Sequence, residues 1–190
     1  MRHLLVAAAL LLAACDLSAE LDIPELRVTL PSQQFVASDT SIPEDWCDPA
    51  EAADPPCIAT ALQVDLGAQV SLLTEENATY DLRLTDLAMA LASTEAGKDL
   101  GGVKLLTIRV GGGAPGAGLV LASYARPPGA AAPAAIAVTG NSNVDLGPYL
   151  EAGRLPVRLE LVLDRPTPAF SADVVAGFSL RVSLDWGAYL

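Results

Sequence analysis

Two runs of alternating apolar and polar residues near the C-terminal end constrain the fold of this chain more than any other feature. In the first run, Arg158 and Glu160 fall between apolar residues of a single parity, which are Leu155, Val157, Leu159, Leu161 and Leu163. Residues 178–186 repeat the pattern. Because successive side chains of a strand point to opposite faces, a period of two predicts β-strands with one buried face and one face in water.

Similar runs predict further strands in the rest of the chain. The clearest lies at residues 62–72, and others are expected at 26–30, 80–84, 103–110, 119–124 and 135–139. Segments rich in Gly and Pro separate these runs, including a hairpin loop expected at 111–118 and an extended connection at 126–133. Pro31 should mark a sheet edge or a bulge, since proline cannot donate a ladder hydrogen bond.

About seven to nine such strands joined by loops predict an all-β fold. We expect a single domain at residues 26–190, built as a two-sheet antiparallel β-sandwich of the immunoglobulin-like or jelly-roll-like kind; the alternative is a closed β-barrel. Hydrophobic residues make up 52% of the chain and aromatic residues only 5%, so Leu, Val and Ala must build the core. Phe178 and Trp186 lie on the apolar parity and are expected in that core.

Other structure is expected at three places. Residues 86–97 are rich in Leu, Met and Ala and carry the one helical signal, although a strand edge fits nearly as well. Residues 145–153 should form one turn before the run that begins at Leu155. Charged residues on the polar parity should form cross-strand pairs on the surface, namely Arg158, Glu160, Arg181 and Asp185.

The N-terminal end has the parts of an export signal. A short basic start precedes an apolar stretch at residues 4–11, and Leu-Ala-Ala at 12–14 leads directly to Cys15. This ending resembles the lipobox of bacterial lipoproteins. The resemblance covers the first fifteen residues and implies that Cys15 receives a diacylglycerol on its sulfur. It also implies that residues 1–14 are removed and that a fatty acid such as palmitate acylates the new amine.

Two other interpretations of this signal stay open: an ordinary secretory signal with a chance cysteine, and an uncleaved transmembrane helix. The apolar stretch is too short for the latter, since crossing roughly 30 Å of hydrocarbon takes about 20 residues. Residues 15–25 should form a lipidated tether. The expected location is the bacterial cell envelope, facing the periplasm or the cell exterior, and Asp16 favours the inner membrane by resemblance to lipoproteins retained there.

The chain is strongly acidic, with a net charge of −12 at pH 7. This charge repels the phosphates of nucleic acids and anionic lipid headgroups. We therefore expect no nucleic-acid partner. The membrane contact should come from the acyl chains on Cys15, because each buried CH₂ contributes about 0.8 kcal/mol of membrane affinity.

Cys47 and Cys57 are the cysteines that remain once Cys15 is lipidated. In the oxidising compartment that the signal implies, two cysteines predict one disulfide. It would close a short loop, worth about 2–3 kcal/mol in the chain-entropy model. A zinc site is the competing interpretation, although two thiolates without any histidine after residue 3 make a poor ligand set.

Catalytic chemistry has little support in this sequence. The one histidine, His3, belongs to the predicted signal, which excludes histidine-dependent nucleophilic catalysis and histidine-bound metals from the processed chain. The glycines at 111–118 lack the Lys and Ser/Thr of a phosphate-binding loop. A glycosidase pair of carboxylates is not distinguished by spacing, and aromatic platforms for a sugar are few. We expect no enzyme, no catalytic residue and no cofactor.

An acidic loop is expected at residues 44–57, around the predicted disulfide. Trp46 lies there beside Glu44 and Asp45, with no periodic apolar face to receive it. One hypothesis makes these three residues a partner-binding patch, because aromatic side chains inside polar rims dominate many interfaces. The alternative folds Trp46 back as a lid over one end of the sandwich. Oxygen ligands for a calcium ion are available in this loop, but the absence of EF-hand spacing favours a solvated loop. The carboxylates concerned are Glu44, Asp45, Asp48, Glu51 and Asp54.

These features favour a lipid-anchored cell-envelope protein that binds or organises another envelope component without catalysis. The membrane and an envelope protein are the expected partners. The alternative is a carrier that shelters a small apolar or lipid ligand between its sheets, which an interior of Leu, Val and Ala permits.

Overall fold

The computed structural model describes residues 18–35, 57–70, 78–95, 98–112, 117–164 and 169–185. Strands dominate this part of the chain, and its helical structure is confined to two short 3-10 helices. None of the helices in these ranges is long and apolar enough to cross a membrane. In chain order the elements are β1 (Ser18–Phe35), β2 (Cys57–Asp65), β3 (Ala78–Leu91), η3 (Ser93–Glu95), β4 (Val103–Val110), β5 (Leu119–Ala125), β6 (Ala135–Thr139), η4 (Gly147–Tyr149), β7 (Arg154–Leu163) and β8 (Phe170–Asp185).

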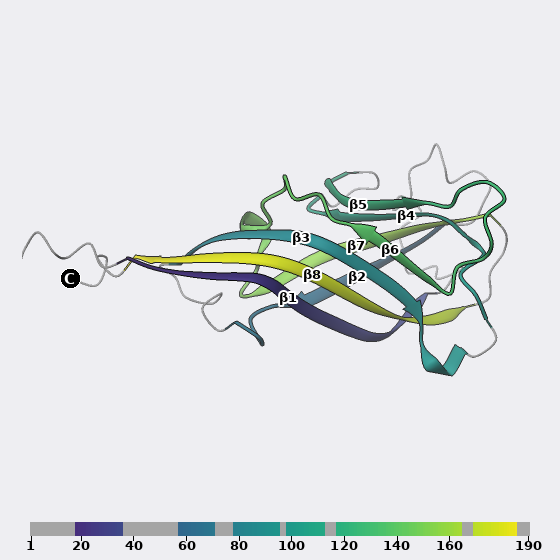
Figure 1. The fold of residues 1–190 in the computed structure, drawn as a ribbon, viewed down its shortest axis with the longest axis horizontal. Helices are drawn as coiled ribbons and strands as arrows, with labels where there is room; N and C mark the ends of the chain where they lie inside the picture. Colours follow the sequence, from purple (N-terminus) through teal and green to yellow (C-terminus); the bar gives the residue numbers. More distant parts are fainter. Residues whose placement is uncertain are drawn as a thin grey trace, which may run out of the picture.

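The strands form two antiparallel four-stranded sheets in a β-sandwich (Figure 1). The first sheet has the order β1-β8-β3-β6, and the second has the order β2-β7-β4-β5. Contacts between β1 and β2, and between β5 and β6, link the sheets along their two sides. The predicted all-β sandwich is therefore confirmed, with two separate sheets in place of a single closed one.

The core lies between the two sheets and follows the alternation of the sequence. Leu155, Leu159 and Leu161 of β7 are all 0% exposed, and Phe178 of β8 is 1% exposed. The strands expected at 103–110 and 135–139 coincide with β4 and β6. Trp186, the other aromatic residue expected in the core, lies outside the described residues.

β1 begins earlier than the sequence predicts. Residues 18–25 form its first part and pair with β8, starting from the register of Ser18 with Asp185. The register shifts between Ile23 and Leu26, so the apolar residues before the shift are out of phase with those after it and the sequence shows no continuous alternation. Leu21 is itself 40% exposed. A tether that extends to residue 25 is therefore wrong, and the domain begins before residue 26.

The predicted irregularity at Pro31 is confirmed. The register of β1 with β8 shifts between Leu30 and Gln33, and Ser32 has a φ of 52°. The Ser32 N–H donates to the Asp173 carboxylate at 2.8 Å. β1 is an edge strand of the first sheet. Such shifts break up the row of backbone groups that an edge strand would otherwise offer to another chain.

Of the two alternatives for residues 86–97, the helix is wrong and the strand is confirmed up to Leu91. β3 continues to Leu91, and the helical part is limited to η3. A register shift between Leu84 and Asp86 changes the parity of the buried residues, so Leu84 and Leu87 both face the core. The helical expectation rested on the good helix formers Leu, Met and Ala, and pairing of this segment with β8 and β6 outweighs that propensity.

β2 ends at Asp65, before the end of the alternating run at 62–72. The N–H of Val70 donates to the carbonyl oxygen of Leu66 at 2.9 Å and closes a turn. Leu66 is 0% exposed and Val70 is 8% exposed. The turn therefore keeps both side chains in the core. The alternating pattern of the sequence continues here although the backbone is no longer an extended strand.

The turn predicted at residues 145–153 is confirmed by η4, which lies between β6 of the first sheet and β7 of the second. One carboxylate oxygen of Asp145 accepts hydrogen bonds from the N–H of Leu82 at 3.2 Å and from the N–H of Gly147 at 2.9 Å. The crossover is thereby fastened to β3.

Candidate functional site

From Val157 to Leu163, β7 is buried on both of its faces, although it carries charged residues there. Arg158 and Glu160 point away from the core, yet they are only 8% and 7% exposed. The prediction that they form a surface pair is therefore wrong. The alternation identifies the face on which a side chain lies, but Arg109 of β4 and the hairpin between β4 and β5 pack over that face and remove it from water.

Three charged side chains on this outer face form one network. The Nε of Arg158 donates to Oε1 of Glu160 at 2.8 Å, and the Nε of Arg109 donates to Oε2 at 2.9 Å. The exposed fractions of the side chains are 16% for Arg109, 9% for Arg158 and 8% for Glu160. Glu160 therefore fixes both guanidinium groups, each through a different carboxylate oxygen.

Arg158 also holds the hairpin that joins β4 to β5. Its Nη2 donates to the carbonyl oxygen of Ala117 at 2.8 Å, and its Nη1 donates to that of Gly112 at 3.5 Å. The antiparallel pairing of β4 with β5 confirms the predicted hairpin. Gly112 and Gly118 have φ values of 77° and 94°, a conformation that L residues with side chains rarely adopt.

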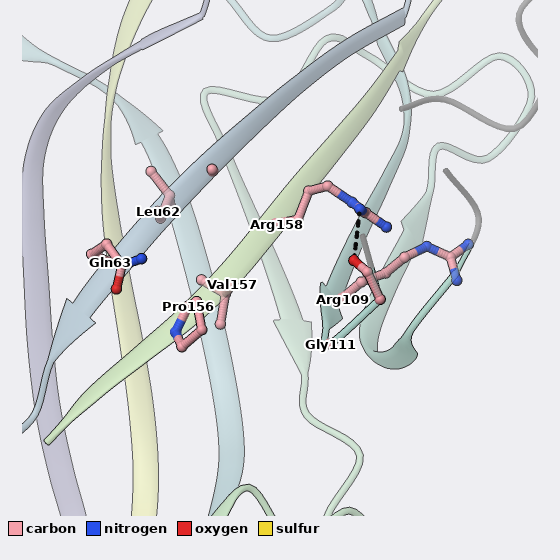
Figure 2. A pocket seen from close by; sticks show the side chains of 9 residues that line it. Leu62, Gln63, Arg109, Gly111, Pro156, Val157 and Arg158 are labelled. Carbon is pink, nitrogen blue, oxygen red and sulfur yellow. Dashed lines mark hydrogen bonds between the residues drawn. The ribbon is translucent and has the colours of Figure 1, made fainter. Parts of the chain in front are cut away.

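A pocket of about 210 Å³ opens beside the two arginines (Figure 2). Ala61 and Gln63 of β2 and Pro156 of β7 form part of its wall, and Arg109, Arg158 and Gly112 form another part. The arginines are the charged residues of this lining. Guanidinium groups bind carboxylate and phosphate oxygens through a planar fork of N–H donors. The arrangement is therefore suited to bind an anion.

Most of the site residues predicted from the sequence lie outside the described residues. This applies to Cys15, to Cys47 and to the proposed patch of Glu44, Asp45 and Trp46. Cys57 is the first residue of β2, but its side chain is not described. Lipidation, the disulfide and the partner-binding patch stay predictions.

The acidic residues weighed for calcium, including Asp48, Glu51 and Asp54, also lie outside the described residues. Within the described ranges, no group of three or more His, Cys, Asp or Glu side chains could hold a metal ion.

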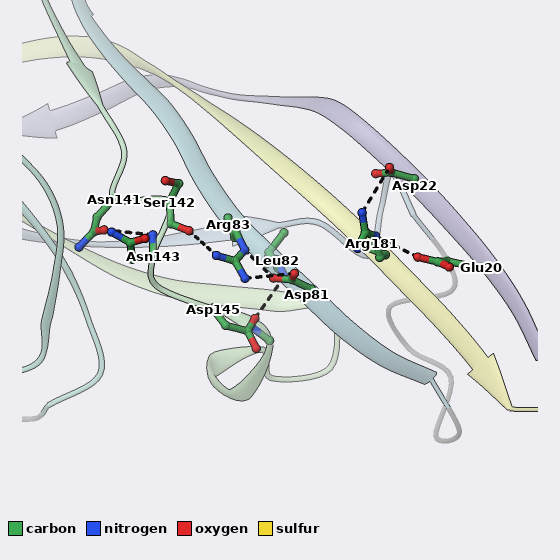
Figure 3. Close-up of polar contacts among 11 residues, drawn as sticks. Glu20, Asp22, Asp81, Leu82, Arg83, Asn141, Ser142, Asn143, Asp145 and Arg181 are labelled. Atoms are coloured by element: carbon green, nitrogen blue, oxygen red, sulfur yellow. Dashed lines mark hydrogen bonds and ion pairs between the residues drawn. The ribbon is translucent and has the colours of Figure 1, made fainter.

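Arg181 lies near the tip that β1 and β8 share (Figure 3). Its Nε is 3.0 Å from Oε1 of Glu20, and its Nη2 is 3.8 Å from Oδ2 of Asp22. All three side chains are between 55% and 62% exposed, so these pairs contribute little free energy. Arg181 is thus part of a cross-strand surface pair, as predicted. The side chain of Asp185 is not described, although its backbone pairs with Ser18.

The sequence pattern missed Arg109 and the pocket. Arg109 lies opposite Arg158 in the register of β4 with β7, although the two residues are far apart in the sequence. The available signal was a charge on the outward parity of two strands. Without the strand order, that signal does not bring the two arginines together.

Comparisons with known proteins give no family. No protein-family model matches the chain, and no curated protein matches it. Among solved structures, the chain is similar to Desmodium yellow mottle tymovirus, with 12% identity, coverage of 89% of this chain and 88% of the other, and a TM-score of 0.35. It is also similar to a 60-mer BFDV capsid protein (10% identity, 90% and 95% coverage, TM-score 0.35) and to Cocksfoot mottle virus (12% identity, 88% and 95% coverage, TM-score 0.40). At these values the likeness carries no conclusion about the function of this chain.

Proposed function

We propose that this chain is a lipid-anchored, non-catalytic binding module of the bacterial cell envelope. The lipobox-like end of the signal, Leu-Ala-Ala-Cys at residues 12–15, supports the anchor on Cys15. The acidic charge of the chain supports a contact with the membrane through acyl chains and not through a basic surface.

The observation that carries the binding role is the pocket beside Arg109 and Arg158. Removing charged side chains from water costs several kcal/mol per ion, and apolar residues of similar volume often stabilise a fold better. The core between the sheets does not include these charges. Their retention on a face that could have been apolar is thus best explained by recognition of a ligand.

The residue types at the pocket are suited to binding. Its described lining consists of Ala, Leu, Gln, Arg, Gly, Pro and Val residues. Neither a nucleophile nor an adjacent general base is among them, and the neighbouring carboxylate of Glu160 is engaged by both arginines.

The carrier alternative requires apolar space between the sheets. The core side chains described there are buried: Phe35 of β1 and Phe170 of β8, for example, stack as cross-strand neighbours with their ring centroids 5.1 Å apart and are 0% and 4% exposed. No specific observation favours the carrier, so the binding module is the proposal.

The short link between Cys15 and β1 determines which end of the domain would lie near the membrane. Pairing of β1 begins at Ser18, three residues after Cys15. Three extended residues span at most about 10 Å. A lipidated Cys15 would therefore hold the tip shared by β1 and β8 close to the bilayer, with the remainder of the sandwich extending away from that tip (Figure 1).

Cell fractionation tests the anchor. We expect wild-type protein in the membrane fraction after a high-salt wash, and the Cys15→Ala variant in the soluble fraction. Cys47→Ala is the matched control, because it removes another cysteine and should leave the protein with the membrane. If Cys15→Ala also stays with the membrane, the proposed anchor is wrong.

A further inference from the structure

We infer that the pocket beside Arg109 and Arg158 binds a small oxyanion, carried by a carboxylate or phosphate group. This inference rests on the proposed binding role and specifies its ligand. No nucleic acid, extended polyanion or anionic bilayer fits the same observations.

The chemistry of the two arginines favours an oxyanion. They lie directly opposite each other on β4 and β7, and both side chains line the pocket. Their low exposure places them where hydrogen bonds to an anion are stronger than in water. An incoming oxyanion would share these guanidinium groups with Glu160 and with the hairpin carbonyl oxygens.

Hydrogen bonds hold both arginines of the site in place before any ligand arrives. Glu160 holds both arginines through their Nε atoms, and Arg158 is also fixed by the carbonyl oxygens of Gly112 and Ala117. Binding would therefore cost little side-chain entropy, because the long side chains are already ordered.

The volume of the pocket limits the size of the ligand. About 210 Å³ is below the range of roughly 300–1,000 Å³ that is usual for drug-sized ligands. A carboxylate or phosphate group on a small body fits this space. Ala61, Pro156 and the amide of Gln63 would contact that body, since they form the wall beside the arginines.

The charge of the whole chain excludes larger anions. A net charge of −12 repels any extended anionic surface, including nucleic acid and an anionic bilayer. A small anion inside the pocket lies close to two guanidinium groups, while salt screens the distant carboxylates beyond a Debye length of about 8 Å. The chain can therefore bind small anions in preference to larger ones.

Titration calorimetry tests this inference on the full chain purified in detergent. The probes are inorganic phosphate and sodium acetate, with ionic strength held constant by sodium chloride. We expect saturable binding of at least one probe at one site per chain. Arg109→Gln should raise Kd by about tenfold or more, since it removes charge-assisted hydrogen bonds to the anion. Arg109→Lys keeps the charge but removes the planar fork, so it should cause a smaller loss.

Arg154→Gln is the matched control. Arg154 lies on the same strand, its side chain is 64% exposed, and its carboxylate partner Asp65 is 3.8 Å away. Its substitution should leave Kd unchanged. The melting temperature of each variant checks the fold, and Arg109→Lys keeps the inference testable if Arg109→Gln does not fold.

Three results would overturn the inference: no saturable binding of either probe, equal weakening by Arg154→Gln, or binding insensitive to both Arg109 variants. Vesicles of phosphatidylglycerol provide a further arm. Arg109-dependent binding to these vesicles without a response to phosphate or acetate would assign the pocket to a lipid headgroup and refute a free small anion. Fractionation of Cys15→Ala is independent of anion binding, so the two proposals can fail separately.

Discussion

Arg109 and Arg158 lie directly opposite each other in the register of β4 with β7, and Glu160 accepts a hydrogen bond from the Nε of each. Like charges at directly opposed positions of a sheet destabilise it. The bridging carboxylate offsets this repulsion while both cations stay largely out of water. Glu160 is therefore the residue on which the network depends.

Replacement of this carboxylate should be costly. We expect Glu160→Gln to lower the free energy of unfolding by about 3 kcal/mol or more, because removing one partner leaves buried charge uncompensated. Asp65→Asn is the control: it removes a carboxylate that faces Arg154 at 3.8 Å, with both side chains about half exposed or more. That change should stay below about 0.5 kcal/mol. Urea denaturation measures both values, and equal effects would refute a buried role for Glu160.

The hairpin beside the pocket should depend on Gly118. A Cβ at this position would lie 2.6 Å from the carbonyl oxygen of Val110 and still closer to that of Gly111. Gly129 also has a positive φ, but its Cβ would meet nothing within 4 Å. Gly129→Ala should therefore cost about 1–2 kcal/mol of backbone strain alone. Gly118→Ala should cost roughly a further 1–3 kcal/mol from the steric clash. Similar melting temperatures for the two variants would contradict the close approach of the hairpin strands.

Glu95 should make stability depend on pH. Its carboxylate accepts hydrogen bonds from Lys98 and from the N–H of Ser171, which lower its pKa below the ordinary value for glutamate. A lowered folded-state pKa gives stability that is present above the ordinary pKa and is lost as pH falls through the folded value.

We therefore expect Glu95→Gln to lower the melting temperature at pH 7, and the difference from wild type to shrink as pH falls below about 4. Glu25→Gln serves as the control, because Glu25 pairs with Arg27 while its side chain is 68% exposed. This variant should leave the melting temperature nearly unchanged. A difference for Glu95→Gln that stays constant down to acid pH would show that the charge of Glu95 contributes nothing.

The alternation of the sequence was sufficient to predict the strands and the sandwich. β4 and β6 coincide with the predicted runs. β6 pairs with β3 without a register shift, and β4 keeps Leu106, Ile108 and Val110 buried on one parity although its register shifts near Val103 and Ile108. The error in β3 arose from the good helix formers after Asp86, which pair with β8 and β6, and the error in β1 arose at the register shift between Ile23 and Leu26. Both are places where pairing between strands, and not local pattern, determines which side chains face the core.

The candidate site could not be predicted for a related reason. Alternation placed Arg158 and Glu160 on an outward face, which is correct. Whether an outward face meets water depends on what packs over it, and here Arg109 and the hairpin after Val110 do so. These neighbours come from a strand about fifty residues earlier in the chain, so the order of strands in the sheet had to be known first.

The mass of the intact protein isolated from bacterial membranes tests the proposed lipid anchor most directly. We expect a chain that begins at Cys15, with a mass increased by a diacylglycerol on the sulfur and an acyl group on the new amine, and fragmentation should locate both additions on Cys15. An unmodified chain, or one that still carries residues 1–14, would contradict the proposal that this sandwich is held on the membrane by lipid.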